Sequence, residues 1–88
     1  MTGPAFKVWR VLEEKEVADE HGHKYRIITK KEFVGEIVNP RQEIYVTWME
    51  LVGRFGEGYY LVEIPKEIRQ RYAVPAEQRI TTPGLFSN

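Results

Sequence analysis

Alternating apolar and polar residues run through the first forty positions and predict a long antiparallel hairpin. Between residues 6 and 12 every second side chain falls on the same face of an extended chain. The turn-forming stretch "ADEHGHK" follows, and Gly22 within it can adopt a positive φ. We therefore expect strands over residues 6–16 and 24–38, joined by that turn. Gly35 inside the second strand predicts a β-bulge or a bend.

A change of period near residue 47 predicts a helix. Four apolar side chains recur at i, i+3, i+4 and i+7, which is one stripe of a helix: Trp48, Leu51, Val52 and Phe55. Thr47 and Glu50 have the spacing of a capping box, and Gly56 offers a left-handed stop. These signals predict a two-turn helix over residues 48–55. A strand over residues 43–55 stays open as an alternative, because "EIYVTWMEL" is rich in β-forming residues and "EIYV" suits a short strand of its own.

The last third of the chain reads as strand, short helix and strand. The run "YYLVEI" alternates and then stops at Pro65, a residue that suits the first turn of a helix. One face of that strand carries Tyr60, Val62 and Ile64. Ile68 and Tyr72, spaced i and i+4, give a narrow apolar edge to a short helix over residues 66–72. A final strand is expected around residues 79–82.

Together these elements predict an α+β fold in one small domain over residues 1–88, with an antiparallel sheet of three to four strands led by the long hairpin. Residues 1–5 and 83–88 are expected to be flexible or partner-bound tails. Leu85 and Phe86 in the second tail are too apolar to leave in water without a reason. The expected core consists of Val8, Ile28, Trp48, Leu51, Val52, Phe55, Val62 and Ile64.

Composition excludes several classes of protein. The chain has no cysteine, which removes disulfides, thiolate catalysis and any cysteine-based zinc site. Because small secreted domains usually need disulfides, a cytoplasmic location is expected. The longest apolar run covers residues 59–62 and cannot span a membrane, so no membrane partner is expected. Glu, Lys and Arg far outnumber Asn and Gln, a balance common in thermophile proteins.

The charges balance along the whole chain. Thirteen basic residues face thirteen acidic ones, eight of each in residues 1–44 and five of each in residues 45–88. A protein held to DNA by bulk attraction usually carries a basic surplus. Within the predicted hairpin, the acidic run "EEKEVADE" opposes the basic run "HKYRIITKK", so we expect cross-strand ion pairs worth ~0–1 kcal/mol each.

Two histidines near the hairpin turn are the candidates for metal binding or acid–base chemistry. His21 and His23, with Asp19 and Glu20 beside them, share one turn and lack a third ligand from elsewhere. They are also the best general bases near neutral pH, but no nucleophile pattern accompanies them, because the sole serine is Ser87 in the tail. We therefore expect no metal, no cofactor and no enzymatic activity.

Residues 62–80, "VEIPKEIRQRYAVPAEQRI", resemble the core of the AbrB-type swapped-hairpin DNA-binding regulators. Those proteins run from a strand through Ile-Pro-Lys-Glu-Ile-Arg into a short helix and a second strand, and residues 64–69 fit that run. The chain departs from the family at Tyr60 and Leu61, where the family has Gly-Arg, and at residues 77–78, where it has Gly-Asp. The resemblance implies a DNA-binding homodimer with interlocked strands, in which Arg69 contacts DNA.

Basic residues cluster after Pro65 and are the candidate nucleic-acid contacts: Lys66, Arg69, Arg71 and Arg79. A structural interpretation stands beside this one. In it Pro65 turns a corner of the fold, Ile68 and Tyr72 pack on the sheet, and the arginines face solvent.

Neutral charge, the absence of a catalytic constellation, a small core and many aromatic residues favour a non-enzymatic binding module. We expect it to act through protein–protein contacts with itself, as a dimer or higher oligomer, or with another protein. The alternative is a homodimeric DNA-binding transcriptional regulator that uses residues 66–79. The two functions differ in electrostatics, because DNA binding weakens steeply with salt whereas an aromatic-anchored protein contact does not.

Overall fold

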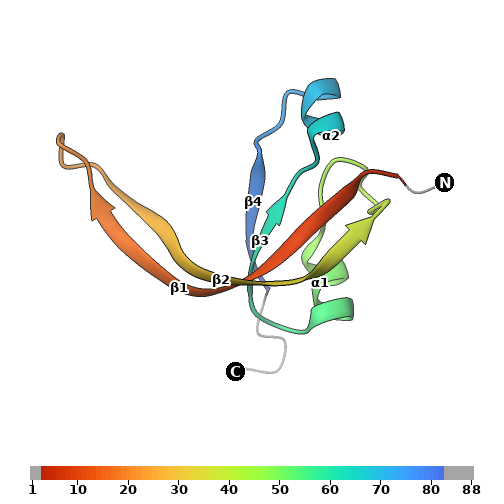
Figure 1. Ribbon diagram of the computed structural model, residues 1–88, viewed down its shortest axis with the longest axis horizontal. Coiled ribbons are helices and arrows are strands. Elements are labelled where there is room, and N and C mark those ends of the chain that lie inside the picture. The colour runs from red at the N-terminus through yellow and green to blue at the C-terminus, as the bar shows by residue number, and fades with distance from the viewer. Residues whose placement is uncertain (1–2, 83–88) are drawn as a thin grey trace.

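The computed structural model describes residues 3–82, along which four strands and two helices follow one another (Figure 1). In chain order they are β1 (Ala5–Ala18), β2 (Lys24–Val38), α1 (Trp48–Phe55), β3 (Tyr59–Glu63), α2 (Lys66–Arg71) and β4 (Glu77–Thr81). The strands form one sheet in the order β2-β1-β3-β4, and every neighbouring pair is antiparallel. The α+β class, the long leading hairpin and both predicted helices are therefore confirmed.

Only the base of the β1–β2 hairpin belongs to the sheet. β3 pairs with residues 7–10 of β1, so the two long strands continue beyond this point as a two-stranded arm. We call residues 12–31 the hairpin arm; Figure 1 shows it curving away from the other strands. Three register shifts interrupt the β1–β2 pairing, and such bulges bend and twist a strand pair. The shifts account for the curvature of the arm.

Gly35 lies at the first of these shifts, as its place inside β2 predicted. Val8 pairs with Gly35, whereas the next residue of β1 pairs with Phe33, so Val34 is the extra residue of the bulge. Gly35 has a φ of +153°, a value that side-chain-bearing residues rarely adopt. A Cβ atom at this position would lie 2.9 Å from Cε1 of Phe55. Glycine therefore lets the last residue of α1 pack directly against the sheet.

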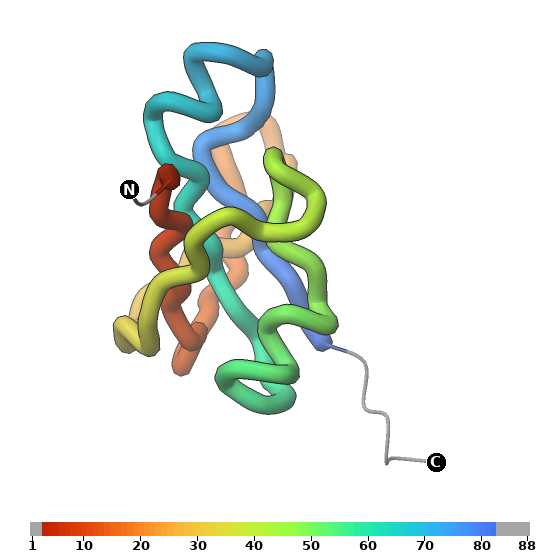
Figure 2. The backbone as a smooth tube through the Cα atoms, turned by 90° about the vertical axis from the view of Figure 1, so that its right-hand side faces the viewer, coloured from red at the N-terminus to blue at the C-terminus, as the bar shows by residue number. Residues whose placement is uncertain are grey.

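The core lies between one face of the sheet and the chain segment that follows β2. Figure 2 shows residues 39–58 crossing one side of the sheet while the arm leaves on the far side. The buried apolar side chains are Phe6, Val8, Ile37, Val46, Leu51, Tyr60, Leu61, Val62, Ile64 and Ile68, and all of them except Leu61 form one cluster. Partly buried side chains, Phe55 and Tyr72 among them, pack against this cluster. The core thus joins β1, β2 and β3 to both helices, and Ile80 of β4 packs against it.

Half of the predicted core is confirmed in full. Val8, Leu51, Val62 and Ile64 are buried. Val52 and Phe55 are only partly buried.

Two predicted core residues are wrong. Trp48 is 36% exposed, because its side chain lines an open groove beside β4 together with Ile80 and Thr81. Ile28 is half-buried, because it lies on the projecting arm and not over the sheet.

Helix α1 begins with the capping box that the sequence predicted. The Thr47 hydroxyl accepts the backbone N–H of Glu50, and the Glu50 carboxylate accepts the backbone N–H of Thr47 at 2.9 Å. The predicted left-handed stop at Gly56 is wrong in its conformation. Gly56 has φ 87° and ψ −177°, outside the left-handed helical region, although its N–H still donates to the carbonyl of Val52.

The strand predicted for "EIYV" is wrong, and residues 43–46 are irregular. The side-chain amide of Gln78 replaces a neighbouring strand there. Its Oε1 accepts the N–H of Val46 at 3.1 Å, and its Nε2 donates to the Val46 carbonyl at 3.4 Å. Because both backbone groups of Val46 are satisfied in this way, the segment needs no ladder of its own.

Candidate functional site

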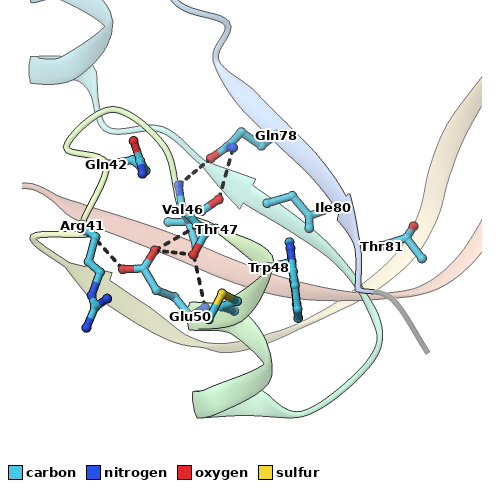
Figure 3. A pocket seen from close by; sticks show the side chains of 10 residues that line it. Arg41, Gln42, Val46, Thr47, Trp48, Glu50, Gln78, Ile80 and Thr81 are labelled. Carbon is cyan, nitrogen blue, oxygen red and sulfur yellow. Dashed lines mark hydrogen bonds between the residues drawn. The ribbon is translucent and has the colours of Figure 1, made fainter. Parts of the chain in front are cut away.

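A groove with a volume of about 810 Å³ lies between the first turn of α1, the segment before it and β4 (Figure 3). We call it the β4 groove. Apolar side chains form much of its wall: Val46, Trp48, Met49 and Ile80. Its polar lining consists of Arg41, Gln42, Thr47, Glu50, Gln78 and Thr81.

Three large apolar side chains are exposed together at this end of the molecule. Met49 is 65% exposed, Tyr45 is 43% exposed and Trp48 is 36% exposed. Single exposed apolar residues are common on protein surfaces, but a group of them beside a groove is typical of a contact surface. Aromatic residues and methionine are also enriched where proteins meet.

Hydrogen bonds hold the walls of the groove in place. The Glu50 carboxylate accepts the backbone N–H of Arg41 at 3.1 Å as well as that of Thr47. Burial would raise the pKa of Glu50, but these two N–H donors and the Thr47 hydroxyl outweigh it and hold the pKa of that carboxyl below its ordinary value. On the other wall the Gln78 amide fixes Val46. The groove is therefore preformed, with the side chains of Thr47, Glu50 and Gln78 already hydrogen-bonded within the chain.

β4 is an edge strand, and its outer side borders the groove. Ile64 donates its N–H to Ala76, and Thr82 donates its N–H to Gly58. Hydrogen-bonded pairs alternate along an antiparallel ladder, so the even-numbered residues of β4 bond to β3. The backbone N–H and C=O groups of Glu77, Arg79 and Thr81 consequently point away from β3. In the part of the chain that the structure describes, no strand pairs with this edge.

The four predicted nucleic-acid contacts do not form one patch. Lys66, Arg69 and Arg71 lie on α2 and are exposed, whereas Arg79 lies on β4. Arg69 donates from Nε to the carbonyl of Ile64 at 3.1 Å, which ties its side chain to the corner at the end of β3.

The structural interpretation of the chain reversal at Pro65 is confirmed. Ile68 is buried and Tyr72 packs against the core, as that interpretation predicted. Strand, helix and strand follow one another in the order that the hydrophobic pattern predicted.

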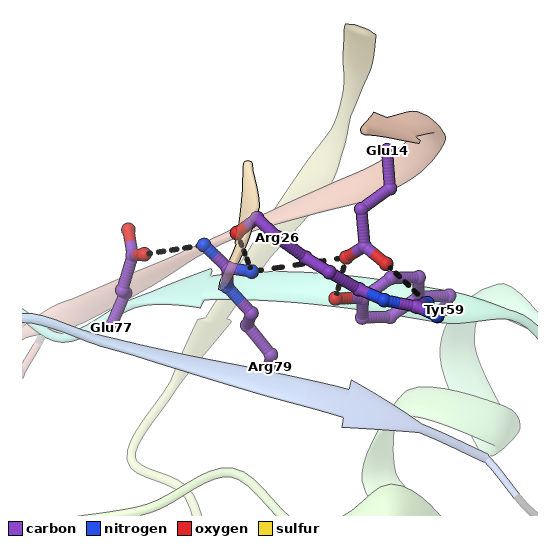
Figure 4. Close-up of polar contacts among 5 residues, drawn as sticks. All are labelled: Glu14, Arg26, Tyr59, Glu77 and Arg79. Atoms are coloured by element: carbon purple, nitrogen blue, oxygen red, sulfur yellow. Dashed lines mark hydrogen bonds and ion pairs between the residues drawn. The ribbon is translucent and has the colours of Figure 1, made fainter. Parts of the chain in front are cut away.

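Arg79 belongs to a polar cluster that joins the arm to the sheet (Figure 4). We call this cluster the arm junction. Arg79 donates to the carbonyl of Arg26 at 2.9 Å and lies 3.8 Å from Glu14 and 3.9 Å from Glu77. Glu14 also accepts the hydroxyl of Tyr59 and pairs with Arg26 at 3.0 Å. The guanidinium of Arg79 is thus already occupied by contacts within the chain.

Cross-strand ion pairs occur on the arm, as the opposing charge runs predicted. Arg26 pairs with Glu14, and Lys24 lies 3.7 Å from Glu16. The charges of the arm therefore largely neutralise one another.

The arm junction makes the stability of the protein sensitive to acid. The Tyr59 hydroxyl, and after it Arg26, lower the pKa of Glu14 below its ordinary value of 4.5. A carboxyl whose pKa is lower in the folded state stabilises the fold above pH 4.5, and this contribution is lost as the pH falls through the lower value. We expect Glu14→Gln to lose less unfolding free energy than the parent between pH 6 and pH 3, measured by urea denaturation. Glu20→Gln, at the exposed hairpin tip, should behave like the parent; equal pH dependence of all three proteins would contradict the role of Glu14.

The two histidines lie at the exposed tip of the arm. One carboxylate oxygen of Asp19 accepts the N–H groups of His21 and His23, at 2.9 and 2.8 Å, which forms the turn. Among residues 3–82, no three histidine or acidic side chains come together as metal ligands.

Over the same residues, neither helix has the length and hydrophobicity needed to cross a bilayer.

Searches of protein-family models, curated proteins and solved structures find no match to this chain. The site is therefore interpreted from its own geometry.

Sequence reasoning missed the β4 groove, because its walls come from residues 41–50 and 78–81, which only the folded chain brings together. One signal was present: Met49 is apolar but lies outside the helical stripe of Trp48, Leu51, Val52 and Phe55, so its side chain was not expected to face the core.

Proposed function

We propose that this protein is a non-enzymatic binding module that takes an extended chain segment onto the free edge of β4 and associates with itself through that edge. The observation that carries the proposal is the position of a strand edge, unpaired among residues 3–82, directly beside a largely apolar groove. In recognition by strand addition, backbone hydrogen bonds supply affinity and pockets for alternate side chains supply specificity. The β4 edge offers the backbone hydrogen-bonding groups, and the β4 groove offers the pocket.

The alternation of β4 supports this arrangement. The backbone groups of Glu77, Arg79 and Thr81 point outward, where an added strand would pair with them. The side chains of Gln78 and Ile80 line the groove. Because directly opposite residues of paired strands share a face, every second side chain of the added strand would lie over the groove. An apolar side chain there would meet Trp48.

Light scattering across a concentration series tests the proposal. A single chain has a mass of 10.4 kDa, and we expect a larger mass at high micromolar concentration. Trp48→Arg should lower the mass toward that of one chain, because it places a charge on the groove wall. Tyr25→Arg is the matched control, since Tyr25 is an exposed aromatic residue on the arm. A parent protein that stays at 10.4 kDa at every concentration would overturn self-association.

DNA binding through α2 is the second candidate function, and three exposed basic side chains on one short helix favour it: Lys66, Arg69 and Arg71. The net charge of zero and the engagement of Arg79 within the arm junction weigh against it. We expect weak binding of duplex DNA at physiological salt. Fluorescence anisotropy at two salt concentrations measures it, with Arg69→Ala as the test variant and Arg54→Ala on α1 as the control. Submicromolar, salt-sensitive binding that is lost only in Arg69→Ala would make DNA binding the better proposal.

A further inference from the structure

We propose that a second pocket of this protein binds a small organic anion, a carboxylate or phosphate group attached to an aromatic or apolar body. The pocket lies between the start of β1, the loop that follows β2 and helix α2. We call it the arginine pocket, because Arg41 of that loop and Arg71 of α2 both line it. The inference does not depend on the β4 edge and goes beyond the proposed function.

The arginine pocket has the dimensions of a small-molecule site. Its volume is about 460 Å³, within the range of about 300–1,000 Å³ that is usual for such sites. Its lining comes from three parts of the chain that are far apart in the sequence. Pro4, from the expected first tail, belongs to this lining, whereas Leu85 and Phe86 of the expected second tail lie outside the described residues.

The two arginines of the pocket have no partner among residues 3–82. Of the seven arginines in the chain, four are held by ion pairs or hydrogen bonds: Arg10, Arg26, Arg69 and Arg79. The other three are Arg41, Arg54 and Arg71, and two of them line this one pocket.

The charge of the lining favours an anion. Glu43 is its one acidic residue, so two arginines against one glutamate leave one net positive charge. A guanidinium can bind a carboxylate or a phosphate group through two parallel hydrogen bonds. An anionic group between Arg41 and Arg71 would supply the partner that both side chains lack within the described chain.

The apolar part of the lining is fixed by the core. Phe6 and Ile68 line the pocket and are buried members of the hydrophobic cluster, and Tyr72 lines it and packs against that cluster. Because core side chains are closely packed, this wall cannot readily collapse into the pocket. An aromatic or aliphatic body attached to the anionic group would bury apolar surface against these three side chains.

The loop that carries Arg41 has an unusual backbone. Asn39 has a φ of 54° and Glu43 a φ of 55°; among residues 3–82 no other residue besides glycine has a positive φ, and both line this pocket. Strained backbone of this kind gathers at ligand sites. The N–H of Glu43 donates to the carbonyl of Pro40 at 3.0 Å, and the N–H of Arg41 donates to the Glu50 carboxylate at 3.1 Å. These bonds hold the backbone of Arg41 beside the pocket.

Amide chemical shifts measured by NMR test the inference with four probes: phenyl phosphate, benzoate, inorganic phosphate and benzyl alcohol. We expect phenyl phosphate and benzoate to shift the amides of residues 39–43 and 68–72, and the tighter of the two identifies the preferred anion. Inorganic phosphate lacks the apolar body and benzyl alcohol lacks the charge. Each of these two should therefore bind at least about tenfold more weakly.

Variants of the three arginines without partners assign the binding to this pocket. Arg41→Gln and Arg71→Gln should each weaken the binding of phenyl phosphate and benzoate about tenfold or more, because each loses a hydrogen bond to a charged group. Arg54→Gln is the matched control, since Arg54 is exposed on α1 and does not line the pocket. Arg71 does not line the β4 groove, so Arg71→Gln should lose the anion without changing the mass seen by light scattering.

Three results would overturn the inference. The first is no shift with either organic anion. The second is an equal loss of binding in Arg54→Gln, which would mean a general attraction of anions to basic side chains. The third is a shift of these amides by duplex DNA but by neither organic anion, which would favour DNA binding through α2 instead. Circular dichroism melting of each variant checks that it remains folded.

Discussion

Replacing Leu51 with alanine should lower the free energy of unfolding by about 2–5 kcal/mol. Leu51 is 0% exposed and is the buried residue of α1 that faces the sheet. A chain of this length has a total stability of roughly 4–13 kcal/mol, so the loss would remove a large part of it. Urea denaturation followed by circular dichroism measures the change.

Met49→Ala is the matched control for Leu51→Ala. Both residues lie on α1, but Met49 is 65% exposed, so its removal should change stability by no more than about 0.5 kcal/mol. Equal losses in the two variants would mean that α1 presents a different face to the sheet.

Replacing Gly35 with alanine should cost about 2–6 kcal/mol for two reasons. Its φ of +153° strains any residue with a side chain, at about 1–3 kcal/mol. The new methyl group would also press against the ring of Phe55, and crowding of a packed core costs about 1–3 kcal/mol more. Denaturant unfolding measures the sum, and adding Phe55→Leu should recover the part due to crowding.

Gly53→Ala is a control that should change the stability in the opposite direction. Gly53 lies inside α1, and a Cβ atom there would meet nothing within 4 Å. Because alanine favours the helix over glycine, the variant should be more stable by up to about 1 kcal/mol. If Gly35→Ala were as stable as Gly53→Ala, the close approach of Phe55 to β2 would be wrong.

Periodicity along the sequence was sufficient to predict the hairpin, both helices and the strand before Pro65. These elements follow from contacts between near neighbours, such as the capping box of Thr47 and Glu50. The irregular segment at residues 43–46 could not be predicted in this way. Its backbone is satisfied by the side chain of Gln78, which lies 32 residues away from Val46.

The errors in the predicted core and site have the same origin. Trp48 was assigned to the core because it fits the stripe of its helix, but a stripe does not reveal where the covered sheet ends. Ile28 was assigned from its apolar character, but it pairs with Glu14 on the arm, beyond residues 7–10 of β1 where β3 pairs. Arg79 was grouped with the arginines of α2 by its place in the sequence, whereas the fold directs it to Glu14 and Arg26.

The sheet order β2-β1-β3-β4 has a kinetic consequence for a chain that folds as it is synthesised. The β1–β2 hairpin closes a short loop around Gly22, so it can form early. Strand β3 lies beside β1 in the sheet, and its Glu63 pairs with Lys7, so this contact spans most of the chain. Until β3 pairs with β1, the edge of β1 at residues 7–10 has no neighbouring strand and the core that contains Phe6 and Val8 is incomplete. We expect the docking of β3 to be the late step of refolding. Pulsed amide exchange should then show early protection of the β1–β2 hairpin alone. The chain in which the hairpin has formed but β3 has not yet paired should be the species most prone to aggregate.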